Sequence, residues 1–442
     1  MAADPTAARR LLEQEARGLL TRLARVRPFA LVESMVPAAA LSSAALNAIE
    51  GYLSAGRREL RARVQRYLAW VRGPAAARAT PEEVQRRFTF LRLRFNVVLS
   101  QFDLFADVLT QRSEHDNGVW LAGLDVLATD ALELPGATYE RPPLVCYVDR
   151  GHGAAIRRAR TRLPGGGENP AAVIRVPRER MVGAGIASSL VHEVGHQAAA
   201  LLELVESLRP LLHGMQRQGG AETVTWTLWE RWISEIVADL WSVARVGVGS
   251  TTGLIGVVSL PRAFVFRTSM EDPHPTPWIR VLLSCAMGDA LYPHPQWQKL
   301  AALWESFYPL NDDVPARTRI VLARMKAGIP AFVQLLVHHR PRALAGRSLL
   351  EAFEPHERTP ARLAALYRAS GGRFERLRGG SPTLVFAVVG QARHDGRITP
   401  EAESRLLADL LTFWALRRTL SPAGAAAATT PPPRPALALN VP

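Results

Sequence analysis

The chain has 442 residues, of which 48% are hydrophobic and 21% are charged. This length allows two to three domains, or one catalytic domain with helical additions, and the composition is too apolar for a disordered protein. The formal net charge is +14, but the arginines are spread along the chain instead of forming one block, so we expect no specific nucleic-acid binding.

Residues 1–140 are predicted to form an N-terminal helical module. Leu and Ala recur at helical spacing between Arg and Glu in ARRLLEQEARGLLTRLARV, which is typical of amphipathic helices. Thr80, Pro81, Glu82 and Glu83 predict an N-cap, a first-turn proline and acidic residues near the positive helix end. The N-terminus lacks the apolar run of a secretory signal, and no stretch approaches 18 uninterrupted apolar residues. We therefore expect a soluble, cytoplasmic protein without a membrane span.

Residues 141–305 are predicted to form the catalytic core. PPLVCYVDR and AAVIRVPRER are rich in Val and predict two strands, separated by the turn-rich segment RLPGGGENP. A helix is predicted from about Ala184 to about Leu208, ending before Pro210, and another from about Thr223 to Val246.

Two cysteines, Cys146 and Cys285, stand in the apolar segments LVCYV and LLSCAM. Buried free thiols explain them better than a disulfide framework, which favours a reducing compartment.

Residues 306–420 are predicted to form a C-terminal helical region. Its predicted breaks are at prolines, namely Pro315, Pro330, Pro341, Pro360 and Pro382. Thr399, Pro400 and Glu401 predict a capped helix start. Residues 421–442 are rich in Pro and Ala and are predicted to be a disordered tail.

Together, the predicted helices and strands indicate a mainly α fold class, of the α+β type, with one small β-sheet.

The segment HEVGH carries the first chemical signal. On a helix, His192 and His196 are four residues apart and project from one face, so both can direct a ring nitrogen at one metal ion. Glu193 is rotated by about 100° from His192, which suits a general base beside the metal. Alternatively, the two histidines are satisfied core residues. The small, apolar flanks in ASSLVHEVGHQAAALL disfavour that alternative, because buried polar groups need partners.

The segment EIVAD carries the second signal. Catalytic zinc takes three protein ligands and a water. Glu235 and Asp239 are four residues apart in another apolar helix, so one carboxylate can bind the metal while the other accepts a hydrogen bond from a ligating histidine. Alternatively, the two acids bridge to arginines such as Arg231.

HEVGH followed about 40 residues later by EIVAD resembles the gluzincin metallopeptidases. The ExxAD form is closest to the family that includes the CAAX prenyl proteases and the heat-shock-induced membrane proteases. That family also carries a His-Pro pair with an arginine six residues after the histidine, and this chain has His274, Pro275 and Arg280. A Pro-rich loop opening a helix is the alternative interpretation of this last segment.

The resemblance covers about residues 170–285 and implies a zincin-like core with active-site helices. It implies that His192, His196 and Glu235 bind Zn2+, that Glu193 is the general base, and that Asp239 is the partner of His192. His274 and Arg280 are then expected to stabilise the oxyanion, a role for which cations and hydrogen-bond donors are suited. This list completes the predicted site.

The predicted function is that of a zinc-dependent hydrolase, an endopeptidase acting on a peptide or protein substrate. The alternative is a helical scaffold or interaction protein with a structural or inactive zinc site, against which Glu193 argues because a structural site has no use for it. A third hypothesis is a basic nucleic-acid-binding helical protein, whose affinity would collapse with salt. The oligomeric state stays open.

Two features near the site complete the prediction. The strand at Ala172–Val176 directly precedes the HEVGH helix, and the resemblance suggests a sheet edge to which an extended substrate adds as a strand. A plain buried strand is equally compatible with the sequence. His152, in the turn DRGHG, could lie near the site, but a surface histidine is the favoured interpretation.

Overall fold

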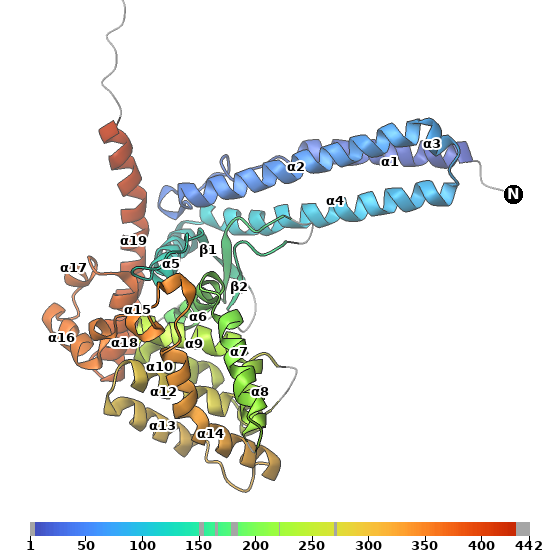
Figure 1. Cartoon of the computed structure of the whole chain (residues 1–442). Coiled ribbons are helices and arrows are strands. Elements are labelled where there is room, and N and C mark those ends of the chain that lie inside the picture. Colours follow the sequence, from blue (N-terminus) through green and yellow to red (C-terminus); the bar gives the residue numbers. More distant parts are fainter. Residues whose placement is uncertain are drawn as a thin grey trace, which may run out of the picture.

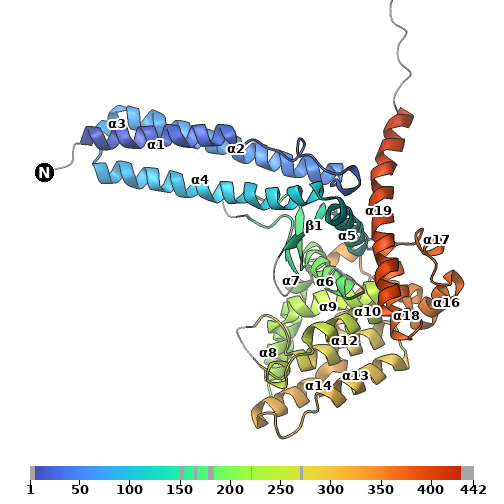
Figure 2. The same ribbon diagram turned by 180° about the vertical axis from the view of Figure 1, so that it is seen from behind.

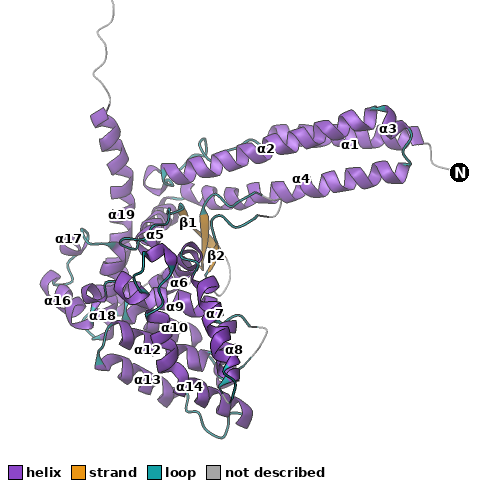
Figure 3. Cartoon of the chain, in the orientation of Figure 1, coloured by secondary structure: helices purple, strands orange, loops and turns teal. Residues whose placement is uncertain are grey.

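The computed structural model describes residues 5–149, 154–163, 167–177, 184–220, 222–268 and 272–429. The described chain is mainly helical and contains one three-stranded sheet (Figure 3). The predicted mainly α class is therefore confirmed. His152 lies outside the described residues.

Three long helices form an arm that extends from the body of the molecule (Figures 1 and 2). They are α1 (Pro5–Arg25), α2 (Ser43–Arg72) and α4 (Pro81–Thr110), with the short α3 (Pro74–Ala77) at the turn between α2 and α4. Phe88, Leu91 and Phe95 of α4 are buried at three- and four-residue spacing, so each helix presents one apolar face to the arm's own core. Thr80 caps α4 through the backbone N–H of Glu83, as predicted.

The sheet lies between the arm and the body, and its strand order is β1-β3-β2. The strands are β1 (Leu144–Asp149), β2 (Ala155–Arg157) and β3 (Ala172–Pro177); β1 runs parallel to β3, and β2 antiparallel to it. Val145 and Val173 belong to the arm's core, whereas Cys146 and Ile174 belong to the core of the body. Burial on both faces explains the continuous apolar runs that revealed β1 and β3.

The prediction that the strand at Ala172–Val176 forms the sheet edge is wrong. β3 is the central strand, because β2 pairs with its residues 173–175. β2 was not predicted, since three residues are too few to show an alternating pattern. Among the described residues the sheet therefore has two edge strands, β1 and β2. Side chains of Gln111 and Asp125 bind backbone groups of β1, so β2 is the edge to which an extended chain can add.

The helix predicted to end before Pro210 is interrupted earlier. α6 (Ala184–Leu201) is followed by Glu203 in a left-handed conformation (φ 51°), and α7 (Leu204–Arg217) then contains Pro210. Pro210 is the seventh residue of α7, beyond the first four whose N–H groups lack an intrahelical partner, so α7 continues through it with one backbone hydrogen bond fewer. The second predicted helix is likewise divided at Trp232 into α8 (Thr223–Arg231) and α9 (Ile233–Val246).

The rest of the body is a stack of helices that follows in chain order. They are α10 (Val248–Val258), α11 (Arg262–Val265), α12 (Pro277–Leu291), α13 (Pro295–Phe307), α14 (Ala316–Val337), α15 (Leu349–Ala352), α16 (Pro360–Ser370), α17 (Phe374–Leu377), α18 (Pro382–His394) and α19 (Pro400–Thr429). Pro360, Pro382 and Pro400 open helices as predicted, but Pro330 lies inside α14 and does not break it. α19 extends to Thr429, into the segment predicted to be a disordered tail.

Cys146 and Cys285 are buried and free, which confirms the prediction for both thiols. Burial raises the pKa of the Cys285 thiol to about 12. The thiol therefore stays protonated at neutral pH and behaves as a small apolar side chain.

Among the described residues, one helix is long and apolar enough to cross a membrane by length and composition, namely α14. One face of α14 packs into the core of the body through Leu322, Met325, Ile329 and Phe332. Their three- and four-residue spacing is that of an amphipathic helix covering a protein core.

A buried ion pair joins the arm to the body. Arg112 follows the last turn of α4, and its guanidinium lies 3.0 Å and 3.2 Å from the two carboxylate oxygens of Asp125 in α5 (His115–Leu132). Asp125 also accepts a hydrogen bond of 2.8 Å from the backbone N–H of Cys146 in β1. The side chains of Arg112 and Asp125 are 0% and 2% exposed. Arg418 lies 3.4 Å from Asp125 as a second cation, whereas Asp125 is the carboxylate that pairs with the buried Arg112.

Replacement of Asp125 by Ala is expected to lower the free energy of unfolding by about 3–5 kcal/mol, because it leaves a buried guanidinium without its counter-charge. Denaturant titration followed by circular dichroism measures this loss. The matched control is Asp116→Ala in the same helix, whose side chain is 99% exposed and whose loss should cost less than about 0.5 kcal/mol. Equal stabilities of the two variants would contradict the assigned role of the ion pair.

Candidate metal centre

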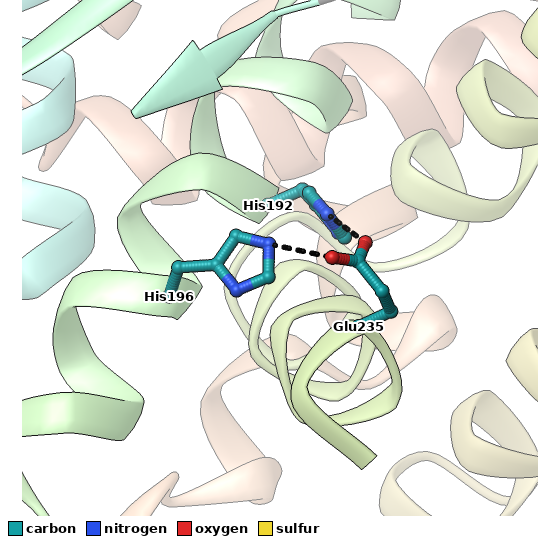
Figure 4. A group of neighbouring side chains, drawn as sticks. All are labelled: His192, His196 and Glu235. Atoms are coloured by element: carbon teal, nitrogen blue, oxygen red, sulfur yellow. Dashed lines mark hydrogen bonds and ion pairs between the residues drawn. The ribbon is translucent and has the colours of Figure 1, made fainter. Parts of the chain in front are cut away.

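His192 and His196 lie on α6, one turn apart, and Glu235 faces them from α9 (Figure 4). One ligand atom from each of the three residues lies within 4.8 Å of the others. Nε2 of His192 is 3.2 Å from Oε2 of Glu235, and Nε2 of His196 is 3.4 Å from its Oε1. Two atoms bound tetrahedrally to one zinc ion at about 2.05 Å are separated by about 3.3 Å. The three side chains could therefore hold a metal ion.

Gly195 allows the two helices to approach each other. A Cβ atom at this position would lie 2.9 Å from both Cα and the carbonyl oxygen of Ala238 in α9. Such a contact is much too short, and backbone atoms cannot move aside as a flexible side chain can. The glycine between the two histidines thus sets the distance at which Glu235 meets them.

Replacement of Gly195 by Ala is expected to destabilise the protein by about 1–3 kcal/mol through overpacking and to weaken metal binding by forcing α6 away from α9. Thermal unfolding and metal titration measure the two effects. Gly185→Ala is the matched control in the same helix, because a Cβ there meets nothing within 4 Å; it should be neutral or slightly stabilising. A Gly195→Ala protein as stable as the control would contradict this explanation.

Asp239 lies one turn after Glu235 and contacts the other ring nitrogen of His192. Its Oδ1 is 2.8 Å from Nδ1 of His192, where the resemblance placed it. The distance is that of a hydrogen bond, but Nδ1 of His192 lacks a well-aligned acceptor, so the contact is mainly electrostatic. A carboxylate at this position orients a ligating imidazole and increases its basicity.

Arg280 of α12 binds Asp239 from the opposite side. Its Nε is 2.7 Å from Oδ2 of Asp239 and one terminal nitrogen is 2.9 Å from Oδ1, a bidentate arrangement. The same nitrogen is 3.7 Å from Oε2 of Glu235. Arg280 therefore holds the carboxylate that orients His192 and also lies at the pocket that contains Glu193.

His274 lies beside the metal centre in the segment before α12. Its Nε2 is 3.5 Å from Oε2 of Glu235, and its Nδ1 is 2.9 Å from Oδ1 of Asp272. Asp272 also accepts the backbone N–H of His274 at 3.0 Å. This Asx turn holds the ring so that Nε2 points to the site.

The charges of the site perturb the pKa values of its members. Burial raises the pKa of Glu235, but the adjacent imidazoles of His192 and His196 outweigh it and hold this pKa well below its usual range. Burial likewise opposes ionisation of Asp239, but Arg280 and then His192 lower its pKa to about 2. Both carboxylates are therefore ionised at neutral pH.

His192 shows the opposite shift. Burial lowers its pKa, but the Asp239 carboxylate and the hydrogen bond to Glu235 outweigh it and raise the pKa to about 9. The imidazolium lies between two carboxylates, with its Nε2 proton directed at the position where a metal would bind. In the metal-free site, the extra proton on His192 therefore supplies the positive charge that the carboxylates of Glu235 and Asp239 attract.

Glu193 lies in the pocket next to the two histidines. The pocket is bordered by His192, Glu193, His274 and Arg280, with Ser188 and Leu254 from α6 and α10. Glu193 is 8% exposed, so its carboxylate is largely shielded from water and is directed into the pocket. The structure thus brings all seven predicted site residues together.

Three residues contribute to this arrangement that were not predicted from the sequence. Asp272 orients His274, Ser234 Oγ lies 3.4 Å from Nδ1 of His196, and Gly195 permits the close helix contact. Asp272 could have been found from the Asp-Pro-His order, which is typical of an Asx turn. The roles of Ser234 and Gly195 depend on how α6 and α9 pack, which one sequence does not reveal.

No protein-family model, no curated protein and no solved structure matches this chain.

Proposed function

We propose that this protein is a zinc-dependent hydrolase that cleaves peptide bonds. One observation carries the proposal: the ligand atoms of His192, His196 and Glu235 converge, and Glu193 borders a pocket that His192 also borders. A purely structural metal site has no need of an additional buried carboxylate beside the ligands. Two imidazoles and one carboxylate leave one coordination position for water or substrate, which is typical of catalytic zinc.

The charge of the site suits a divalent cation. Glu193, Glu235 and Asp239 contribute three carboxylates, and Arg280 contributes the one fixed positive charge of this cluster. With neutral histidines the cluster carries a net charge of −2, which is costly in a buried site unless a cation offsets it. His192, His196 and Glu235 would hold the ion. When bound, zinc supplies Lewis-acid chemistry, polarising a carbonyl oxygen and making a water molecule acidic near neutral pH.

The side chains around the site have separate roles in the proposed hydrolysis. The Glu193 carboxylate accepts a proton from the attacking water and returns it to the nitrogen of the leaving amine as the C–N bond breaks. Asp239, held by Arg280, keeps His192 in the orientation that its ligand role requires. His274 Nε2 and the Arg280 guanidinium supply positive charge near the oxygen on which negative charge develops.

The proposal is tested by zinc content and proteolysis measured on the same full-length preparation. We expect about one zinc per chain and cleavage of an unfolded protein such as casein, lost with a chelator and restored by zinc. His192→Ala should lose both properties. The matched control His115→Ala, whose side chain is 83% exposed, should lose neither.

Two results would count against the proposal. Absence of zinc from the wild-type protein would make the metal assignment wrong. Stoichiometric zinc without hydrolysis of any peptide or protein probe would instead favour a scaffold protein with a structural zinc site.

A further inference from the structure

A pocket rich in arginine lies on the face of the sheet opposite the metal centre. We call it the basic pocket; it is bordered by Arg157, Arg158 and Arg175, with Tyr147, Ala155 and Leu104. Leu104 belongs to α4 of the arm, so the pocket lies between the arm and the sheet. α6, with His192, contacts the other face of β2 and β3.

β2 connects the basic pocket to the metal centre. Ala154, which directly precedes β2, borders the pocket that contains His192 and Glu193. Within β2, Ala155, Ile156 and Arg157 border the basic pocket, and Ile156 also packs against the core of the body. Successive residues of an extended strand point to opposite faces. An extended peptide that adds to the free side of β2 would therefore direct alternate side chains toward the metal centre and toward the basic pocket.

Two of the arginines of this pocket, Arg157 and Arg158, are available for a ligand. In the part of the chain that the structure describes, no hydrogen bond or ion pair engages the side chain of Arg157 or Arg158, and both are exposed. The nearby Arg160 instead pairs with Glu140 at 2.8 Å. Unpaired guanidinium groups gathered in one pocket suit a carboxylate, which they bind in a bidentate fashion.

The charges around the pocket are not all positive. Burial raises the pKa of Tyr147, and the carboxylates of Asp149 and Asp107 add to this rise while Arg175 and Arg157 oppose it. Neither carboxylate borders the pocket itself. Among the described residues that border the pocket, the exposed guanidinium groups of Arg157 and Arg158 are therefore the charges that a ligand would meet.

We propose that the basic pocket is a subsite that binds an acidic side chain, Asp or Glu, of an extended peptide lying along β2. The identification of this peptide as the substrate rests on the proposed function, but its binding does not. The specificity that follows is for peptides with an acidic residue close to the bond at the metal centre. A lysine at the same position is rejected by like charge.

The test measures peptide binding without hydrolysis. Fluorescein-labelled octapeptides of alternating Ala-Glu, Ala-Gln or Ala-Lys are titrated with the full-length Glu193→Gln protein at about 0.15 M salt, where distant charges are largely screened. Fluorescence anisotropy gives the dissociation constants. We expect the Ala-Glu peptide to bind at least about tenfold more tightly than the Ala-Gln peptide, from charge-assisted hydrogen bonds.

A charge-matched pair of variants separates the pocket from the general positive charge of the protein. Arg157→Glu/Arg158→Glu should abolish the preference for Ala-Glu and favour Ala-Lys. Arg61→Glu/Arg66→Glu changes the net charge equally, at two exposed arginines of α2, and should retain the preference. Equal binding of the Ala-Glu and Ala-Gln peptides, or equal weakening in both double variants, would overturn the proposal.

Hydrolysis is assayed separately on the wild-type protein with the same peptides. Selective binding of Ala-Glu without cleavage would make the proposed function wrong and leave the subsite intact. Cleavage without any preference for acidic peptides would leave the proposed function intact and make the subsite proposal wrong.

Discussion

Replacement of Glu193 by Gln is expected to lower the rate constant of peptide hydrolysis by about 10²–10⁴-fold, the usual contribution of a positioned general base. Gln has nearly the same size as Glu but cannot accept a proton from water at neutral pH. Glu193 is not one of the three clustered candidate ligands. Zinc content and thermal stability should therefore stay close to those of the wild-type protein. Steady-state kinetics and metal analysis of one preparation measure these properties together.

The matched control for this variant is Glu206→Gln, an exposed residue of α7. It removes the same charge from the protein at a distance from the pocket and should leave the rate unchanged. A zinc-loaded Glu193→Gln protein that hydrolyses peptides as fast as this control would show that Glu193 is not the base.

The sequence was most informative where local rules decide the structure. Thr80 and Pro81 start α4 as predicted, because N-cap and first-turn preferences depend on neighbouring residues only. Prolines were less informative, since Pro210 and Pro330 lie within helices. Their tolerance depends on position within the helix and on the packing around it, which a proline count does not reveal.

The cluster of candidate metal ligands was predictable because each half of it is local. The i, i+4 spacing places His192 and His196 on one face of α6, and the same spacing places Glu235 and Asp239 on one face of α9. The contact between these helices is tertiary and depends on Gly195 against Ala238. The three-residue β2, which moves the sheet edge away from β3, also forms only through tertiary pairing.

For Arg280, the sequence resemblance and the structure point to two different roles. The resemblance implied a role for it at the oxyanion, and its guanidinium does border the pocket of Glu193. Its bidentate contact with Asp239 adds a second task, since it holds the carboxylate behind His192. Loss of Arg280 would thus affect the metal ligand as well as the developing charge.

Zinc affinity is expected to increase with pH, about tenfold per unit between about pH 7.5 and 9, and then to level off. In the metal-free protein the pKa of His192 is raised to about 9, so below that pH the imidazole must release one proton before it can bind the metal. Glu235 releases none, because its pKa is held below the usual range. Competition with a fluorescent zinc chelator of known pH dependence measures this slope.

Asp239→Asn provides the control for this pH dependence. It removes the carboxylate that contributes most to raising the pKa of His192, so the proton should leave at lower pH and the slope above pH 7.5 should become flatter. The overall affinity should also fall, by about 10–100-fold, because the neutral amide orients and polarises the imidazole less well. A wild-type affinity that is independent of pH in this range, or an equal slope in the variant, would show that His192 does not exchange its proton for the metal.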